Sequence, residues 1–243
     1  YILYNNELWR IIGVFNNIET DNGKKTLVKI MRNEAIGKYS YDVSSNEIYG
    51  VYNGYGNNDW NTSDLMFELN EYYYNKESSD CYTGKDGKTE VCDFTQIGLS
   101  EEAKNMIERV KWYLGSTSTN TIQLQKMYEK ERETDNTWSG YVGLIYPSDY
   151  GFASYQCQYY LKGISMNNYE ARSCNDTDYI YSSQVAWTIT PNYKFDNKAF
   201  AVGKNLELAN TYEAKYVYPV VYLKEGTQLI SGYGTKESPY IVK

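Results

Sequence analysis

The four cysteines of this chain are its most specific chemical feature, and they form two local pairs. Cys81 and Cys92 bracket a polar stretch in which Lys85-Asp86-Gly87 is typical of a tight turn, and Cys157 and Cys174 bracket a second polar stretch. Four cysteines allow three connectivities, so the sequence favours the local pairing and leaves the other two open. Zinc binding is the competing interpretation, but neither spacing is that of a C-x-x-C knuckle. Disulfides predict an oxidising location, extracellular or at a cell surface.

Histidine, the commonest general base near neutral pH, does not occur in the chain. Histidine-based triads and histidine-ligated zinc are therefore excluded, and acid–base chemistry would have to come from carboxylates. The acidic residues that cluster are Asp59, Asp64, Glu68 and Glu71, and further along Asp176 and Asp178. Asp64, Glu68 and Glu71 have the spacing of one helix face, which predicts a solvated charged face. Asp176 and Asp178 lack the pattern of a calcium loop, so no metal and no cofactor are predicted.

Tyrosine is in clear excess, with 29 copies in 243 residues. Many of them fall in two polar segments, 33–61 and 148–184, which show no sustained periodicity. Tyrosine combines a large contact area and few rotamers with a hydroxyl group, and binding loops use it for these properties. The alternative is that these rings pack beneath their own loops. The predicted contact residues are Tyr49, Tyr52, Tyr55 and Trp60 in the first segment and Tyr159, Tyr160, Tyr169, Tyr179 and Tyr181 in the second.

Length and composition indicate a single domain, residues 1–243. Hydrophobic residues make up 42% of the chain and aromatic residues 16%, enough for a large core. The formal charge of −7 argues against nucleic acid and anionic membrane surfaces as partners, because both attract basic proteins. No apolar run is long enough to predict a membrane span. The chain starts at Tyr1 without methionine, so a targeting or anchoring segment is expected before it, and the sequons at Asn61 and Asn175 are attributed to chance.

Hydrophobic patterning predicts strands at both ends of the chain and helices between them. Strands are expected at 8–15, 26–31, 142–146, 186–189, 199–202, 206–209, 217–223 and 240–242, and helices at 65–73, 99–114 and 122–133. Pro219 is placed at a bulge or strand start because it has no N–H to donate, and Ser148 is interpreted as a helix cap. This order predicts an α+β domain with a mainly antiparallel sheet, paired termini, two or three helices and long ordered loops.

Several motifs, spread in order over nearly the whole chain, resemble a family of extracellular domains of low-GC Gram-positive bacteria. They are Trp9-Arg10-Ile11-Ile12, Asn58-Asp59-Trp60, Trp112-Tyr113-Leu114-Gly115, Tyr146-Pro147-Ser148-Asp149-Tyr150-Gly151, Trp187-Thr188-Ile189-Thr190-Pro191 and Pro219-Val220-Val221-Tyr222-Leu223-Lys224. The resemblance implies a C-type-lectin-like domain, related to the fold of the sulfatase-modifying enzymes, on a bacterial surface. The Glu-Pro-Asn and Trp-Asn-Asp triplets of calcium-dependent lectins are absent, and the redox-active cysteine pair of the sulfatase-modifying enzymes is not carried over.

These observations lead to two functional hypotheses. The first is a non-enzymatic bacterial surface module for adhesion or extracellular assembly, for example as a pilus or filament subunit. Its tyrosine-rich loops would contact a protein or glycan at the surface, or further copies of the chain. The alternative is a glycan-binding module or a glycan hydrolase with two carboxyl groups facing each other across a cleft.

Overall fold

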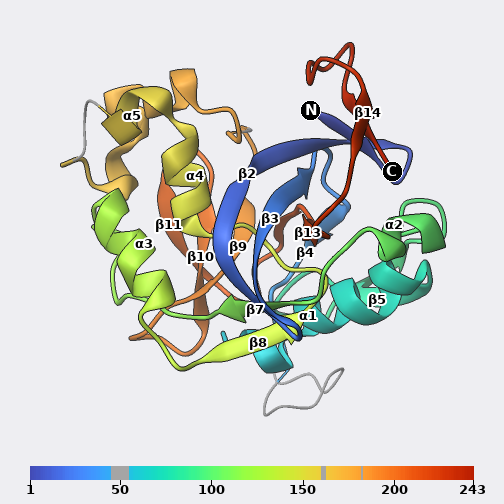
Figure 1. Ribbon diagram of the computed structural model, residues 1–243. Coiled ribbons are helices and arrows are strands. Elements are labelled where there is room, and N and C mark those ends of the chain that lie inside the picture. Colours follow the sequence, from blue (N-terminus) through green and yellow to red (C-terminus); the bar gives the residue numbers. More distant parts are fainter. Residues whose placement is uncertain (45–54, 160–162, 182) are drawn as a thin grey trace.

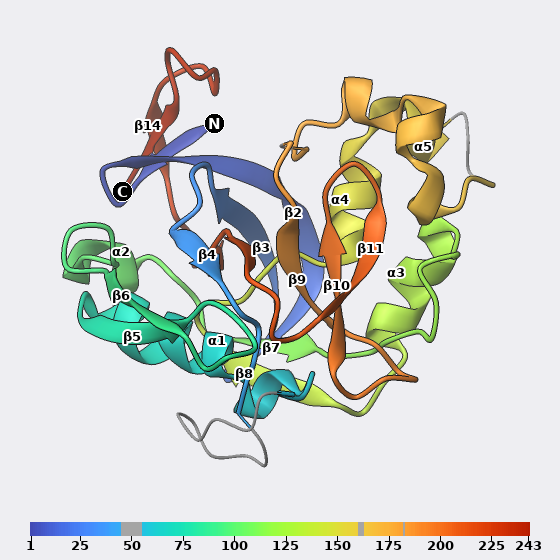
Figure 2. The same ribbon diagram turned by 180° about the vertical axis from the view of Figure 1, so that it is seen from behind.

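The structure, a computed structural model, is built on two mostly antiparallel sheets that lie next to each other (Figures 1 and 2). It describes residues 1–44, 55–159, 163–181 and 183–243. The larger sheet contains β1 (Ile2–Tyr4), β2 (Glu7–Thr20), β3 (Gly23–Arg32), β7 (Val110–Tyr113), β8 (Thr137–Gly140), β13 (Val220–Leu223), β14 (Leu229–Ser231) and β15 (Tyr240–Val242). The smaller sheet contains β4 (Gly37–Tyr39), β9 (Ala186–Pro191), β10 (Lys198–Val202), β11 (Leu206–Asn210) and β12 (Lys215–Val217). These elements confirm the α+β class.

The long hairpin β2–β3 forms the centre of the larger sheet, as its sequence predicts. Its two-residue turn is followed by Gly23, whose φ of +97° is readily adopted only by glycine. Register shifts near Gly13 and Phe15 bend the hairpin. The second half of β3 is buried, so this strand lies in the core rather than at the surface.

The two ends of the chain meet in the larger sheet, which confirms the predicted pairing of the termini. β1 pairs in parallel with β15, and β15 pairs with β14 at the edge of the sheet (Figure 1). The predicted strand 217–223 is two strands, because the chain passes from the smaller to the larger sheet at Pro219. The carbonyl of Pro219 accepts a hydrogen bond from Arg32 N at 2.9 Å, while its missing N–H leaves no donor unsatisfied.

The described residues form five α-helices rather than the expected two or three, and most of them are short. They are α1 (Asp64–Phe67), α2 (Glu101–Asn105), α3 (Leu124–Arg132), α4 (Pro147–Ala153) and α5 (Tyr155–Tyr159). The other helical turns are η1 (Trp60–Thr62), η2 (Glu68–Tyr73), η3 (Met166–Asn168), η4 (Glu170–Arg172) and η5 (Cys174–Thr177). Helices α3, α4 and α5 lie on one side of the sheets, and α1, α2 and the hairpin β5–β6 (Ser78–Tyr82, Thr89–Asp93) lie on the other (Figures 1 and 2).

Three predicted elements are wrong in their extent or type. The helix 99–114 ends after α2, and its second half forms β7, where Trp112 is buried against Tyr222 with ring centroids 5.2 Å apart. The predicted strand 142–146 contains only an isolated bridge from Gly143 to Val220. The predicted loop 148–184 is largely helical in its described part. Long-range packing, rather than local pattern, decides each of these segments.

Aromatic side chains fill the core. Trp9, Trp60, Trp112 and Trp187 are at most 1% exposed.

In the described part of the chain, no helix has the length and apolar character needed to cross a membrane.

Candidate functional site

A pocket open to solvent lies between the two sheets and is the best candidate for a ligand site. It has about 430 Å³ of space that no protein atom fills, part of it open solvent. Its apolar floor is formed by Met31, Ile145, Ile180, Ala186 and Val202. Its polar and aromatic lining is formed by Arg10, Asn33, Tyr150, Tyr181, Gln184 and Tyr218. An apolar floor with a few polar groups is the usual composition of a small-molecule site.

Arg10 from β2 provides the positive charge of this pocket. Its Nε donates to Asn33 Oδ1 at 2.9 Å, and its Nη1 donates to the carbonyl of Tyr179. Its Nη2 has no hydrogen-bond partner in the described part of the chain. The guanidinium is thus held by two hydrogen bonds and by the Tyr1 ring, whose centroid lies 5.0 Å from Cζ, while Nη2 stays available, an arrangement suited to binding a carboxylate.

Asp178 lies beside the pocket and has one unsatisfied oxygen. Its Oδ1 accepts hydrogen bonds from Ile180 N at 2.7 Å and Tyr181 N at 2.8 Å. Its Oδ2 is buried without a hydrogen-bond partner among the described residues. Burial raises the pKa of Asp178 to about 7, although the two backbone N–H groups and the charge of Arg10 oppose this shift. Asp178 therefore titrates near neutral pH at the edge of the pocket.

Only part of the predicted contact set reaches this pocket. Tyr181 lines it, and Tyr179 stands next to it with its hydroxyl donating to the Ile12 carbonyl at 2.7 Å. Trp60 and Tyr169 are 0% and 1% exposed, so the structure places both rings in the core instead of on a contact surface.

The remaining predicted tyrosines do not form one surface. Tyr55 and Tyr159 are both 61% exposed. Tyr55 packs near Lys85 of the β5–β6 turn, whose Nζ lies 5.2 Å from its ring centroid, whereas Tyr159 belongs to α5 on the opposite side of the molecule (Figure 2). Tyr49, Tyr52 and Tyr160 lie outside the described residues.

The acidic cluster near α1 is buried, contrary to the predicted solvated face. Asp64 is 2% and Glu68 is 4% exposed, and only Glu71 and Asp59 lie on the surface. The face turns inward because Asp64 Oδ2 accepts a hydrogen bond from Val43 N at 2.9 Å, in the segment that follows β4. Of the other predicted pair, Asp176 is exposed, while Asp178 points inward.

The Ser44 hydroxyl bridges Asp64 and Asp42, and Asp42 is fully buried. Ser44 Oγ lies 3.0 Å from Asp42 Oδ1 and 3.2 Å from Asp64 Oδ1. A hydroxyl has a single proton, so it donates to one carboxylate and accepts from the other only if that group is protonated. Burial, and then the charge of Asp64, raises the pKa of Asp42 to about 7. The fold therefore favours the protonated form of Asp42 relative to an ordinary carboxyl group.

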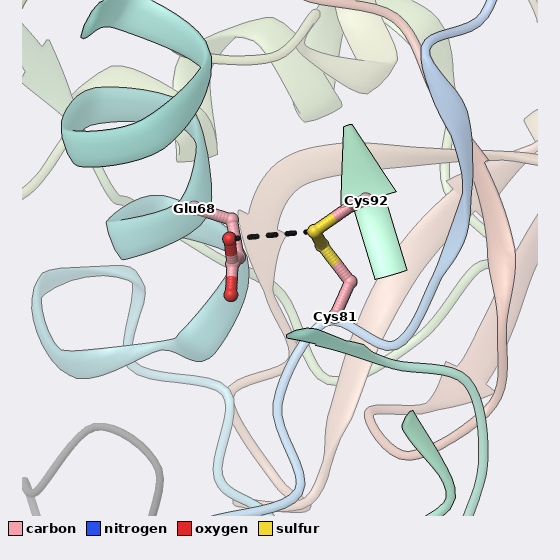
Figure 3. Close-up of side chains that lie close together, drawn as sticks. All are labelled: Glu68, Cys81 and Cys92. Atoms are coloured by element: carbon pink, nitrogen blue, oxygen red, sulfur yellow. Dashed lines mark hydrogen bonds between the residues drawn. A yellow bond between two sulfur atoms is a disulfide. The ribbon is translucent and has the colours of Figure 1, made fainter. Parts of the chain in front are cut away.

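Both predicted disulfides are present, Cys81–Cys92 and Cys157–Cys174, which confirms the local pairing. Glu68 Oε2 lies 3.8 Å from Cys92 Sγ in a buried group with Cys81 (Figure 3). These three residues have the donor types and closeness of a metal site. Disulfide sulfur is a poor metal ligand because metals bind thiolates, so this group is structural. The 157–174 disulfide ties α5 to η5.

Comparisons with protein-family models, with functionally described proteins and with solved structures find no match for this chain. The geometry of the site is therefore the basis for its function.

Sequence patterns did not identify Arg10 or Asp42 as site residues, although the sequence around each contains a feature that could have done so. Arg10 is a charged residue within the apolar run 8–15, and Asp42 precedes the buried Val43.

Proposed function

We propose that this protein is a non-enzymatic recognition module of a bacterial surface, which binds the carboxylate-bearing end of a glycan in the pocket between the two sheets. The two disulfides support an extracellular or cell-surface location. The pairing of the termini in one sheet is a feature that a C-type-lectin-like fold would have.

The observation that carries this proposal is the arginine beside a tyrosine-lined apolar pocket. Sugar rings stack on aromatic rings through their apolar faces, and the half-buried Tyr181 and Tyr218 supply such rings. Arg10 Nη2 supplies a charge-assisted hydrogen bond to a sugar carboxylate. Nucleic acid and anionic membranes are not proposed as partners, because the chain is acidic.

The hydrolase alternative needs two carboxyl groups that face each other across the bound sugar, about 5–10 Å apart. The described residues that line the pocket include no aspartate or glutamate. Asp178 lies beside the pocket and could supply one carboxyl group, but not the pair that hydrolysis needs. Binding is therefore the function that the pocket supports better.

A glycan array that includes uronic and sialic acids, followed by calorimetry, tests this proposal. The wild type is expected to retain an acidic glycan, and Arg10→Met is expected to lose affinity by about 10- to 100-fold, the size of a charge-assisted hydrogen bond. Tyr181→Phe keeps the ring and removes the hydroxyl, so its loss should be smaller. Arg172→Met, on an exposed part of η4, is the matched control. No binding of acidic glycans, or equal affinity for Arg10→Met in a folded protein, would contradict the proposal.

A second candidate function, assembly with further copies of the chain, is favoured by strand β14. This strand forms the edge of the larger sheet beside both termini (Figure 1). Leu229 and Ile230 are each 58% exposed, and Tyr233 is 84% exposed. An exposed apolar edge strand is a template for pairing with another strand.

Light scattering over a range of concentrations tests this second candidate. The wild type is expected to associate, and Ile230→Lys is expected to remain monomeric because a charge at the edge opposes pairing. Val14→Lys is the matched control, since Val14 is 65% exposed on β2 but lies away from the edge. A wild type that stays monomeric at all concentrations, or equal association of Ile230→Lys, would rule out assembly through β14.

A further inference from the structure

A lysine and an aspartate meet in the core of the protein, and neither side chain lines the pocket described above. Lys29 lies on β3 and Asp149 in the first turn of α4, 120 residues apart in the sequence. Lys29 Nζ lies 2.5 Å from Asp149 Oδ2, and the two side chains are 0% and 2% exposed. The pair therefore has almost no contact with water.

Four aromatic rings surround the lysine nitrogen. Their centroids lie 4.5 to 5.5 Å from Nζ and belong to Phe15, Trp112, Tyr146 and Tyr222. In such surroundings an ammonium is poorly solvated, so the neutral amine gains relative to it. Burial accordingly lowers the pKa of Lys29, although the charge of Asp149 opposes this. A neutral amine is a nucleophile, whereas an ammonium is not.

The neighbouring residues hold the carboxyl group in place. Asp149 Oδ2 also accepts a hydrogen bond from Tyr146 N at 2.8 Å, as part of a capping box. Glu131, fully buried on α3, accepts hydrogen bonds from the N–H and the hydroxyl of Ser148, one residue before Asp149. Arg132 Nη1 donates to Glu131 Oε2 at 2.9 Å, which balances that charge.

The short distance alone does not distinguish this pair. Lys204 and Glu170 are also 2.5 Å apart, but their side chains are 58% and 49% exposed. Water solvates both of these side chains. What sets Lys29 and Asp149 apart is the combination of contact, complete burial and an aromatic enclosure.

We propose that Lys29 and Asp149 condense to form an intramolecular amide bond that links β3 to α4. A proton first passes from the ammonium to the carboxylate, giving an amine and a carboxylic acid. The transferred proton goes to Oδ2, the oxygen that Nζ contacts, and the Tyr146 N–H holds this oxygen in place. Nζ then attacks Cγ, and the negative charge develops on Oδ1. The Nζ–Cγ bond forms and the Cγ–Oδ2 bond breaks, Oδ2 leaves as water with the transferred proton and one proton from the amine, and Oδ1 becomes the amide carbonyl oxygen. No oxidant, reductant or further reactant is required.

Mass spectrometry of the purified wild type, reduced and denatured, tests the proposal directly. The expected intact mass is lower than that of the reduced sequence by one water. Tryptic digestion is expected to yield one branched species that contains the peptides of Lys29 and Asp149. The peptides of Lys204 and Glu170 serve as the internal control and are expected to remain separate.

Two variants sharpen this test. Lys29→Arg is expected to abolish the loss of water. Asp149→Asn is expected to form the same amide by releasing ammonia, so that its linked product has the mass of the linked wild type. An unaltered wild-type mass with separate Lys29 and Asp149 peptides would overturn the proposal, whatever the variants do.

Discussion

Replacement of Lys29 by methionine is expected to lower the free energy of unfolding by at least about 3–5 kcal/mol. The reason is that Asp149, with a 2% exposed side chain, would be left in the core without its cation. Breaking a buried ion pair by removing one partner typically has an effect of this size, because an uncompensated charge remains in a medium of low polarity. Equilibrium unfolding in urea, followed by tryptophan fluorescence, measures the change.

The double variant Lys29→Met/Asp149→Asn separates the ion pair from the amide bond. It removes both charges and keeps an acceptor for the Tyr146 N–H. If the wild type holds only an ion pair, the double variant should recover most of the lost stability. If the amide is present, the wild type also gains about 5 kcal/mol from closing a loop of this length on the chain-entropy model, and the double variant stays well below it. If the free energy of unfolding of Lys29→Met lay within about 1 kcal/mol of the wild-type value, neither a stabilising ion pair nor an amide bond would be present.

Local patterns in the sequence were sufficient for those elements that depend on neighbouring residues. The hairpin β2–β3 follows from two apolar runs around a turn, and α1 begins where Ser63 caps it, with Ser63 Oγ accepting from Met66 N at 3.2 Å. The turn between the first two cysteines also predicted their pairing. In each case the decisive contacts lie within a few residues to a few tens of residues.

Long-range contacts account for what the sequence did not predict. Val110 continues the apolar stripe of α2, yet it belongs to β7 because β8 pairs with this segment. The sequence correctly placed Asp64 and Glu68 on one face of a helix. Whether that face points to solvent or to the core depends on Val43 and on the hairpin β5–β6, which both donate hydrogen bonds to it. The pocket combines residues from β2, β3, α4, β9 and β10, and no local pattern reports such a combination.

Buried charges were missed for a related reason. Lys29 stands in the apolar run Leu27-Val28-Lys29-Ile30-Met31, where strand alternation alone would allow it to face solvent. β3 is covered on both faces in its second half, so the side chain has no solvent to reach. A charged residue inside an apolar run of a central strand therefore indicates a buried partner elsewhere in the chain, although it does not identify that partner.

The free energy of unfolding is expected to fall as the pH rises from about 4 to about 8, and Asp42 should account for a large part of this change. Its pKa is about 7 in the folded state, against an ordinary value of 3.8. Between these two values the folded state binds a proton that the unfolded state has lost, so each increase in pH favours unfolding. About three units of difference correspond to at most about 4 kcal/mol. The raised pKa values of Glu131 and Asp178, each about 7, act in the same direction.

The contribution of Asp42 can be isolated by comparing the wild type with Asp42→Asn in urea at several pH values. Asparagine cannot ionise, so the variant does not lose stability through this position as the pH rises. Its free energy of unfolding, measured relative to that of the wild type, should therefore increase by up to about 4 kcal/mol between about pH 4 and about pH 8. Asp59→Asn is the matched control, because it is the same change of side chain at an exposed position outside the buried group of Asp42, Ser44 and Asp64. The Ser44 hydroxyl and the Asn57 N–H, which donates to Asp42 Oδ2 at 2.6 Å, stay in place in both variants. An Asp42→Asn variant with the same pH dependence as the wild type would show that Asp42 and Asp64 do not share a proton.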